Sequence, residues 1–393
     1  MFFDMIKLNK AFKRVNYMLS AAVTIGCLSA CNGKTGVDNG ADAVQIRYSG
    51  KAEMCGASEF FSNRISIVTQ STPNAIVGQI SRAVEVDSLL IVNDDRNQVM
   101  AFDMRNGTNV FAIHNVGQGP GEYNSLYDIA VDADRKELLL LVDKKILIYD
   151  ISGVFTGREI PLDEYCNEIV VKDNKIYLIK ETFANNTLAE TQIAVLDYPS
   201  GRPVASYLQP LEEYAPYCTT QGRSLNLIES NGKKQILFTR KFDSRIYSLG
   251  EADAEPAYCI DWGETAFKPE ENTTYDCAEL AKLTLIKQLV YRVVNVQAGD
   301  STICFSTNIP HIFIADRNAL ELKLYTGIVD DVLGVPLSEM VPISGSNGKV
   351  LFSLPYHLLA KYDSMMPEDE ARRQLVESMD DDSNPLYIIY TLK

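Results

Sequence analysis

The sequence GQGPGEY at residues 117–123 separates two segments of the same design, residues 83–116 and 128–162. Each segment consists of short apolar runs that end in aspartate, followed by a glycine and a last apolar run. A period of roughly 40–45 residues with four strands in each unit is typical of a β-propeller. The repeat therefore predicts an all-β fold in which each unit forms one blade.

The repeat continues to the end of the chain, with further units at 168–208, 225–261 and 291–326. A sixth unit is split between 341–354 and 386–392 and lacks an outer strand. Phe60–Thr69 has the alternation of a strand but no unit of its own. We therefore predict a six-bladed β-propeller with four-stranded blades, in which this N-terminal strand closes the last blade and removes an open sheet edge.

Two insertions interrupt the period, at 265–289 and 355–379. Residues 278–286 and 368–377 within them have the composition of short helices, the second with Pro367 near its start. Both insertions lengthen loops over one face of the propeller. Long loops on a rigid scaffold are common places for binding, although such helices can also simply shield the blade edges.

The N-terminus reads as a targeting segment. Four basic residues precede the mostly apolar run 15–28, and Leu28-Ser29-Ala30-Cys31 then resembles a bacterial lipobox. This resemblance implies cleavage before Cys31 and attachment of a lipid to its thiol. We predict a signal peptide at 1–30, a flexible tether at 31–57 and the propeller at 58–393, with the protein in the cell envelope, on the outer membrane.

The chain is acidic, with a formal net charge of −15. This charge disfavours nucleic acid and anionic membrane surfaces as partners, so the expected membrane contact is through the lipid alone. Six of the eight cysteines lie beyond Cys31, and their spacing matches no zinc pattern. Cys304 is expected to be a buried thiol, and Cys259 with Cys277 is the pair to test for a disulfide.

The loop at 117–123 admits two interpretations. In the structural one, its glycines permit positive φ angles in a tight crossover between blades, Glu122 accepts hydrogen bonds from turn amides, and Tyr123 packs on the next strand. In the other, Gln118, Glu122 and Tyr123 contact a ligand. A phosphate loop is excluded because Pro120 removes an amide donor, Glu122 repels phosphate and no helix follows. The residues assigned to the turn are Gly117, Gly119, Pro120 and Gly121.

Aspartates recur where the strands end, and we expect them to cap turns by accepting hydrogen bonds from backbone amides. They are Asp94, Asp103, Asp132, Asp143, Asp150, Asp197 and Asp316. The alternative is a carboxylate ring that binds Ca²⁺ in the central channel. The three histidines, His114, His311 and His357, show no paired spacing, so no metal site, cofactor or catalytic residue is assigned.

The chain resembles the six-bladed β-propeller lipoproteins of Bacteroides-type bacteria, which are relatives of NHL-repeat propellers. The resemblance rests on residues 59–70, 91–94 with 99–103, the loop 117–123, and 384–390. It covers about residues 58–393 and implies the fold and export.

We therefore expect a non-catalytic binding module for an envelope protein, a peptide or a glycan, met on the face with the inserted loops. The alternative is a metal-dependent enzyme of the lactonase or lyase type with its site in the central channel. A purely structural subunit of an envelope complex is a third hypothesis.

Overall fold

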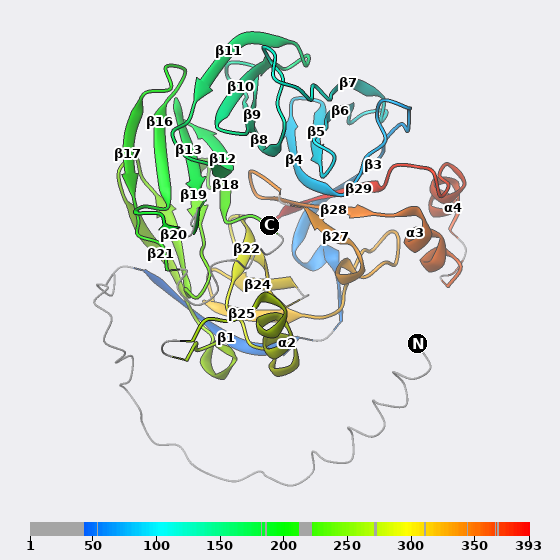
Figure 1. Cartoon of the computed structure of the whole chain (residues 1–393). Coiled ribbons are helices and arrows are strands. Elements are labelled where there is room, and N and C mark those ends of the chain that lie inside the picture. The colour runs from blue at the N-terminus through cyan, green and yellow to red at the C-terminus, as the bar shows by residue number, and fades with distance from the viewer. Residues whose placement is uncertain are drawn as a thin grey trace, which may run out of the picture. The chain divides into compact units, whose positions relative to one another are not determined.

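The computed structural model describes residues 43–393 except 53, 182, 185–186, 212–221, 271–272, 310–311, 344, 366 and 368, and gives only the backbone of 183–184 and 187–188. The expected signal peptide and the expected lipidation site, Cys31, lie outside the described residues. Antiparallel sheets surround a common centre, and their first strands contact one another there (Figure 1). This is the arrangement of a β-propeller, as the repeat predicts.

Three four-stranded sheets follow one another along the chain. The first contains β4 (Ile80–Val86), β5 (Leu89–Asp94), β6 (Val99–Asp103) and β7 (Asn109–Ile113). The second contains β8 (Leu126–Asp132), β9 (Glu137–Val142), β10 (Lys145–Asp150) and β11 (Phe155–Pro161). The third contains β12 (Cys166–Lys172), β13 (Lys175–Lys180), β16 (Ile193–Asp197) and β17 (Pro203–Tyr207). These strands are the predicted ones, with ends shifted by a few residues.

The next sheet has nine strands because β1 (Val44–Ala52) joins two four-stranded groups. One group contains β18 (Leu225–Ser230), β19 (Lys233–Phe238), β20 (Arg245–Leu249) and β21 (Ala254–Asp261). The other contains β22 (Val293–Ala298), β23 (Thr302–Thr307), β24 (Ile312–Asp316) and β25 (Glu321–Tyr325). β1 pairs in parallel with the outer strand of each group, β21 on one side and β25 on the other.

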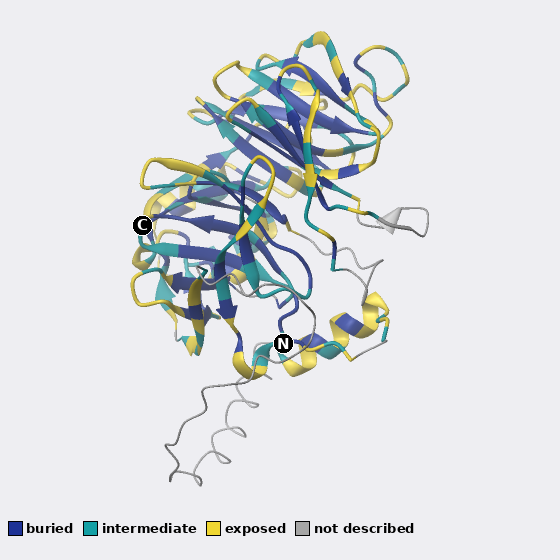
Figure 2. Cartoon of the chain, turned by 90° about the vertical axis from the view of Figure 1, so that its left-hand side faces the viewer, coloured by how far each residue is buried: buried dark blue, intermediate teal, exposed yellow. Residues whose placement is uncertain are grey.

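The core lies between successive sheets, so the inner strands are buried on both faces (Figure 2). Along β9, Leu140 packs towards the sheet β4–β7, whereas Leu139 and Leu141 pack towards the sheet that begins with β12. All three side chains are fully buried. Successive strand residues point to opposite faces, and both faces meet a neighbour here. This explains why the strands read as continuous apolar runs and not as alternating ones.

Strands from the two ends of the described chain form one sheet, in the order β27-β28-β29-β3. These are β27 (Val341–Ile343), β28 (Lys349–Leu354), β29 (Leu386–Leu392) and β3 (Phe61–Val68). β3 pairs with β29 in antiparallel register from Val68 opposite Leu386 to Phe61 opposite Leu392. The predicted pairing of the N-terminal strand with the C-terminal strand is thus present. A buried apolar cluster then packs this sheet against β4, β5 and β6.

The helices occupy two insertions. α2 (Cys277–Lys287) precedes β22, and α3 (Tyr356–Asp363) and α4 (Glu370–Glu377) connect β28 to β29. Val341 at the start of β27 pairs with Ser353 at the end of β28, so the insertion that follows β28 emerges where the first strand β27 begins. α2 directly precedes the first strand β22, so this insertion emerges on the same side. We call this side the insertion face. None of the described helices is long and apolar enough to cross a membrane.

The remaining elements are short. They are β2 (Cys55–Gly56) paired with β26 (Ile328–Val329), the hairpin β14 (Phe183–Ala184) with β15 (Thr187–Leu188), and the 3₁₀ helices η1 (Ala57–Glu59), η2 (Gly263–Thr265) and η3 (Leu337–Glu339). α2 and α4 match the predicted helical segments. α3 is not predicted, because Pro355 at its N-cap provides no capping side chain that would mark a helix start.

Two sequence-based expectations require correction. Residues 44–52 belong to β1 and not to a flexible tether, because Ile46 is buried between β21 and β25 and Tyr48 packs against Trp262. Cys259 and Cys277 form no disulfide: Cys277 is an exposed thiol at the start of α2, and Cys259 lies in β21. Cys304 is buried, as expected.

Asn384 joins the loop before β29 to the segment after β3. Its side-chain oxygen accepts a hydrogen bond from the amide of Val77 at 2.8 Å. Its side-chain nitrogen donates to the carbonyl oxygens of Gln70 at 3.1 Å and Ala75 at 2.8 Å. Asn384 is itself buried, so its removal leaves backbone groups without partners away from water.

We expect Asn384→Ala to lower the free energy of unfolding by about 3 kcal/mol, because each buried polar group left unpaired costs about 1–3 kcal/mol. Urea denaturation followed by tyrosine fluorescence measures the change. Asn318→Ala is the matched control, since Asn318 is exposed in the turn after β24, and it should change stability by less than about 0.5 kcal/mol. Equal effects of the two substitutions would contradict a role for Asn384 in closing the ring of sheets.

Candidate functional site

Polar residues reach the centre of the ring from the first strands of three sheets. Arg82, Asp128 and Glu168 are each the third residue of their strand, in β4, β8 and β12. Each follows an irregularity in the pairing with the next strand of its sheet. A β-bulge of this kind redirects a side chain. Equivalent positions of three consecutive sheets thus place a guanidinium and two carboxylates near the axis.

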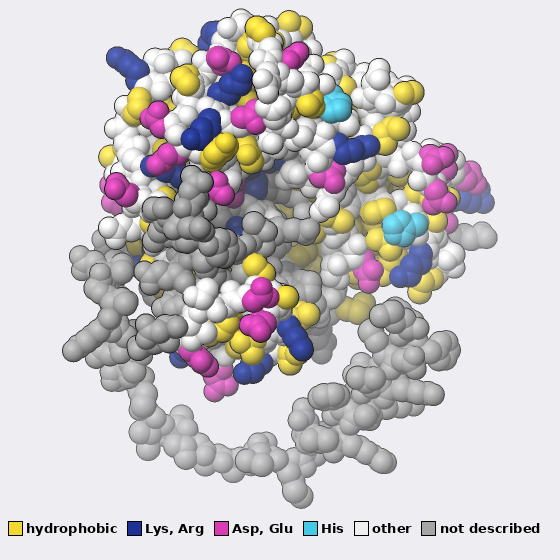
Figure 3. Space-filling view, viewed as in Figure 1, with side chains coloured by type: hydrophobic (Ala, Val, Ile, Leu, Met, Phe, Trp, Pro, Cys, Tyr) yellow, Lys and Arg dark blue, Asp and Glu magenta, His cyan; other side chains and the backbone are white. Residues whose placement is uncertain are grey.

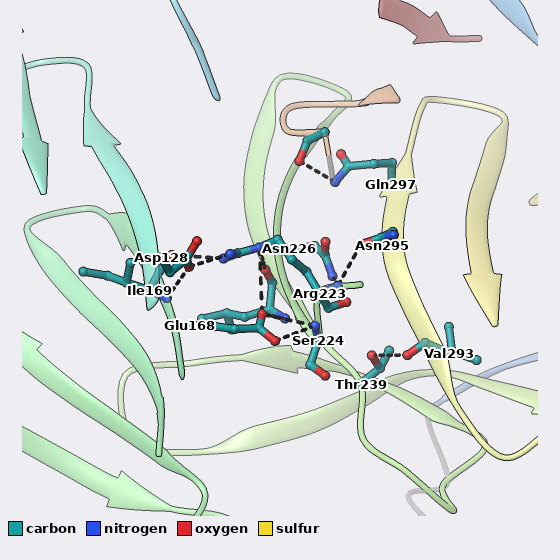
Figure 4. A network of polar contacts seen from close by, with 12 residues as sticks. Asp128, Glu168, Ile169, Arg223, Ser224, Asn226, Thr239, Val293, Asn295 and Gln297 are labelled. Atoms are coloured by element: carbon teal, nitrogen blue, oxygen red, sulfur yellow. Dashed lines mark hydrogen bonds and ion pairs between the residues drawn. The ribbon is translucent and has the colours of Figure 1, made fainter. Parts of the chain in front are cut away.

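Arg223, just before β18, connects these groups. Its guanidinium forms an ion pair with the Asp128 carboxylate and donates to the carbonyl oxygen of Ile169 at 3.1 Å (Figure 4). The amide of Ile169 donates to the same Asp128 carboxylate at 2.8 Å. The backbone amide of Arg223 donates to Asn295 of β22 at 2.7 Å. The network therefore ties together β8 and β12, the first strands of two four-stranded sheets, with β18 and β22, the first strands of the two groups in the nine-stranded sheet.

Glu168 is held in the same way. Its carboxylate accepts hydrogen bonds from the amides of Ser224 at 3.0 Å and Leu225 at 2.8 Å, and it lies 3.8 Å from the Arg223 guanidinium. Both axial carboxylates are thus occupied by backbone amides and by arginine. Arg82, Asp128, Glu168 and Arg223 are called the axial ion cluster below.

The two arginines of the cluster experience opposite net effects. Burial and the adjacent Arg223 lower the pKa of Arg82 to about 9, although Asp128 and Glu168 act against this change. Burial also lowers the pKa of Arg223, but the same two carboxylates outweigh it and the net shift is upward. Both guanidinium groups therefore remain charged at neutral pH and balance the two carboxylates.

A cavity of about 330 Å³ extends from the cluster along the axis. Arg82 lies at one end, and residues at the far ends of the first strands, including Asp132 and Lys172, line the other. The cavity therefore faces the side opposite the insertion face. Its charged side chains are largely paired with one another, as in the ion pair between Asp132 and Arg135 at 2.8 Å.

Within the described part of the chain, no group of three or more His, Cys, Asp or Glu side chains has the geometry to hold a metal ion. His114 and His357 are exposed and lie far apart in the sequence, and His311 lies outside the described residues. The axial carboxylates, the most plausible oxygen ligands on the axis, already bind arginine and amide groups. The donor set of the channel therefore fits a structural ion cluster better than a metal centre.

The loop at 117–123 forms a compact crossover on the insertion face. The Glu122 carboxylate accepts a hydrogen bond from the amide of Gly119 at 2.7 Å. Tyr123 is fully buried and donates to the carbonyl oxygen of Asn97 at 2.7 Å. These are contacts of the structural interpretation, and a ligand cannot reach Tyr123 without rearrangement. Gln118 and Pro120 are exposed, so ligand contact at Gln118 stays a prediction.

The glycines of this loop serve two purposes, whereas the sequence analysis expects positive φ angles throughout. Gly121 alone of the three has a positive φ, 75°, and a side chain there would meet the ring of Phe155. Gly117 and Gly119 leave space for the Glu122 carboxylate, since a Cβ on Gly117 would lie 2.1 Å from its oxygen. The expectation is therefore wrong for Gly117 and Gly119.

The strand-ending aspartates cap turns, as predicted. The Asp94 carboxylate, for example, accepts from the amides of Gly78 at 2.8 Å and Arg96 at 3.0 Å. Asp103, Asp132, Asp143, Asp150 and Asp316 likewise accept from turn amides, and Asp197 accepts from the Ser200 hydroxyl. None of these aspartates belongs to the axial ion cluster.

Two tyrosines that the sequence analysis does not single out are exposed on the insertion face. Tyr127 is the second residue of β8, and Tyr165 immediately precedes β12. Their side chains are 37% and 41% exposed, and their ring centroids lie 6.5 Å apart in an edge-to-face arrangement. The sequence feature that could identify Tyr127 is its position next to Asp128, the polar third residue of an otherwise apolar first strand.

Sheets packed around an axis and tied by a buried ion cluster define a β-propeller whose channel is a structural element. The family described as a domain of unknown function, DUF4934, matches residues 50–391. The chain belongs to this family. The comparison with curated proteins found no match.

The chain is similar to several solved structures, one of which shows the same fold. A Bacteroides fragilis protein described as exported aligns with a TM-score of 0.69 at 14% identity, over 89% of this chain and 100% of its own. A member of the DUF4221 family from Bacteroides vulgatus aligns with a TM-score of 0.49 at 8% identity, over 85% and 97%. BamB from Moraxella catarrhalis aligns with a TM-score of 0.42 at 14% identity, over 73% and 75%. The similarity to the Bacteroides fragilis protein supports the β-propeller fold.

We expect Arg223→Met to lower the free energy of unfolding by about 3–5 kcal/mol, because it leaves the buried carboxylate of Asp128 without its counter-ion. Adding Asp128→Asn to this variant should restore part of the loss. Chemical denaturation of the single and double variants measures both effects. Lys136→Met, which removes the exposed ion pair with Asp87, is the control and should cost at most about 1 kcal/mol. A small loss in Arg223→Met would show that the cluster does not stabilise the ring.

Proposed function

We propose that this protein is a lipid-anchored, six-bladed β-propeller of the cell envelope that acts as a binding module through its insertion face. The partner is another envelope protein, a peptide or a glycan, and the mechanism is recognition by a rigid surface without bond chemistry. The observation that carries the proposal is the pair of exposed tyrosines, Tyr127 and Tyr165, on the face where the inserted loops emerge. Exposed aromatic rings supply large contact area at low entropic cost.

The count of six blades rests on packing. β18–β21 and β22–β25 are two antiparallel groups joined only through β1 and packed face to face across a shared apolar cluster. With these counted separately, an apolar cluster lies between each sheet and the next around the whole ring. β1 then serves as a clasp over the outer edges of two neighbouring blades.

The binding role is favoured over the metal-dependent enzyme because of the channel's chemistry. Asp128 and Glu168 already satisfy Arg223 and backbone amides. Recruiting them to a metal would leave the Arg223 guanidinium buried without a counter-ion, which costs several kcal/mol. The axial groups therefore support a scaffold role, and the insertion face supports recognition.

The expected anchor would keep the propeller close to a membrane. Residues 32–43 separate the expected lipid on Cys31 from the start of β1, and this segment spans at most roughly 40 Å when fully extended. Because β1 pairs on both sides, the tether ends at the outer edge of the propeller. The propeller thus stays within a few tens of ångströms of the membrane surface.

We expect Cys31→Ala to move the protein from the membrane fraction to the soluble fraction of cells, because one terminal lipid-bearing residue holds an otherwise soluble domain. Fractionation with immunoblotting and mass measurement of the mature N-terminus test this expectation. Cys27→Ala is the control and should leave the distribution unchanged. Membrane retention of Cys31→Ala would rule out Cys31 as the anchor.

The binding face is tested by photo-crosslinking in living cells. A photoreactive amino acid at Asn124, exposed in the loop before β8, should yield discrete adducts in the envelope. The control is the same amino acid at Val154, which is 60% exposed in the turn between β10 and β11 on the opposite side. Adducts at Val154 alone, or equally at both positions, would contradict the insertion face as the binding surface.

A further inference from the structure

Charged residues surround the two exposed tyrosines and lie on loops of two neighbouring sheets. We define the tyrosine patch as Tyr127, Asp143, Lys144, Asp163, Glu164, Tyr165, Lys180 and Glu181. Four carboxylates and two ammonium groups give this patch a net negative charge. Figure 3 shows acidic and basic side chains interspersed over one face of the molecule.

Two carboxylates of the patch act on Tyr127 electrostatically. Burial raises the pKa of its hydroxyl, and Tyr165, Asp143 and Glu181 add to the increase by their charge. Asp143 is held in place because it accepts hydrogen bonds from the amides of Asn124 at 3.0 Å and Ser125 at 3.1 Å. The amide of Glu181 donates to the carbonyl oxygen of Tyr165 at 2.9 Å. The Asp143 carboxylate is therefore fixed beside the start of β8, and the backbone of Glu181 is fixed beside Tyr165.

The patch already binds one cation of its own chain. The Lys144 ammonium lies 4.9 Å from the centre of the Tyr165 ring and donates to the carbonyl oxygen of Asp163 at 3.2 Å. Lys180 is paired with Glu164 at 2.8 Å. Among the contacts of the described residues, no cation lies over the ring of Tyr127. Tyr127, like Tyr165, is an exposed ring with carboxylates in the same patch. Tyr165 contacts the Lys144 ammonium, whereas no cation of the described residues contacts the Tyr127 ring.

We propose that the tyrosine patch binds a lysine or arginine side chain presented by a basic segment of a partner protein. The cation lies against the ring of Tyr127, and the carboxylates of Asp143 and Glu181 balance its charge. This inference rests on the proposed function and names the chemistry of the partner. A cation on an aromatic ring strengthens binding by about 2- to 30-fold depending on its desolvation, and the acidic rim adds electrostatic attraction that salt weakens.

The test uses the full-length protein in detergent micelles and a fluorescent hexa-arginine peptide, with binding followed by fluorescence anisotropy. Tyr127→Leu should weaken binding by at least about twofold although it changes no charge. Glu181→Gln should weaken it severalfold and reduce its dependence on salt. Glu255→Gln removes an exposed carboxylate from β21, remote from the patch, and should have no effect. Thermal unfolding of each variant verifies that the fold is retained.

Unchanged affinity in Tyr127→Leu would overturn the proposal, because attraction to the acidic chain as a whole would then explain the binding. Binding of a neutral oligosaccharide such as cellohexaose, lost in Tyr127→Leu while the peptide fails to bind, would overturn it in favour of a glycan. In either case, adducts at Asn124 would leave the insertion face as the binding surface. Absence of those adducts would reject the proposed function itself.

Discussion

The pairing of β3 with β29 is the constraint on which the rest of the structure depends. These strands lie at opposite ends of the described chain, and the sheet they share completes the ring. Bringing them together costs loop-closure entropy that only the finished ring returns. Asn384 adds hydrogen bonds from the loop before β29 to the segment that follows β3. The apolar clusters between sheets can then be continuous around the axis, because no sheet is left with an uncovered face.

A ring of sheets places the first strands around a channel, where their buried backbone groups need hydrogen-bond partners. The axial ion cluster supplies such partners, as for the amide and carbonyl groups of Ile169. The single residue Arg223 contacts groups of β8 and β12 through its side chain and connects to β22 through its backbone. Buried ion pairs contribute little net stability compared with apolar packing, but they penalise any arrangement that separates the partners. The cluster therefore favours one position of the sheets relative to one another. Binding of a metal by its carboxylates would compete with this structural role.

The strand pattern and the turn aspartates could be predicted because both are local. A run such as Leu138–Val142 identifies a strand buried on two faces, and an aspartate at the end of a strand can cap the turn beside it, as Asp94 does for the amide of Arg96. The axial ion cluster could not be predicted, because Arg223 and Asp128 are 95 residues apart and meet only in the closed ring. β1 is not predicted for another reason: Ile46 and Tyr48 alternate with polar residues, but their glycine- and aspartate-rich neighbourhood favours a tether.

β1 and the tyrosine patch belong to different sheets of the same scaffold. β1 is the element nearest to the expected anchor, and it is fixed at the outer edges of β21 and β25. The tyrosine patch lies on β8, β12 and the loops beside them, which belong to other sheets. Because the sheets between them are packed and tied at the axis, β1 and the patch keep a fixed geometry. A rigid scaffold of this kind pre-organises the proposed binding surface, so less conformational entropy is lost on binding than with a flexible receptor.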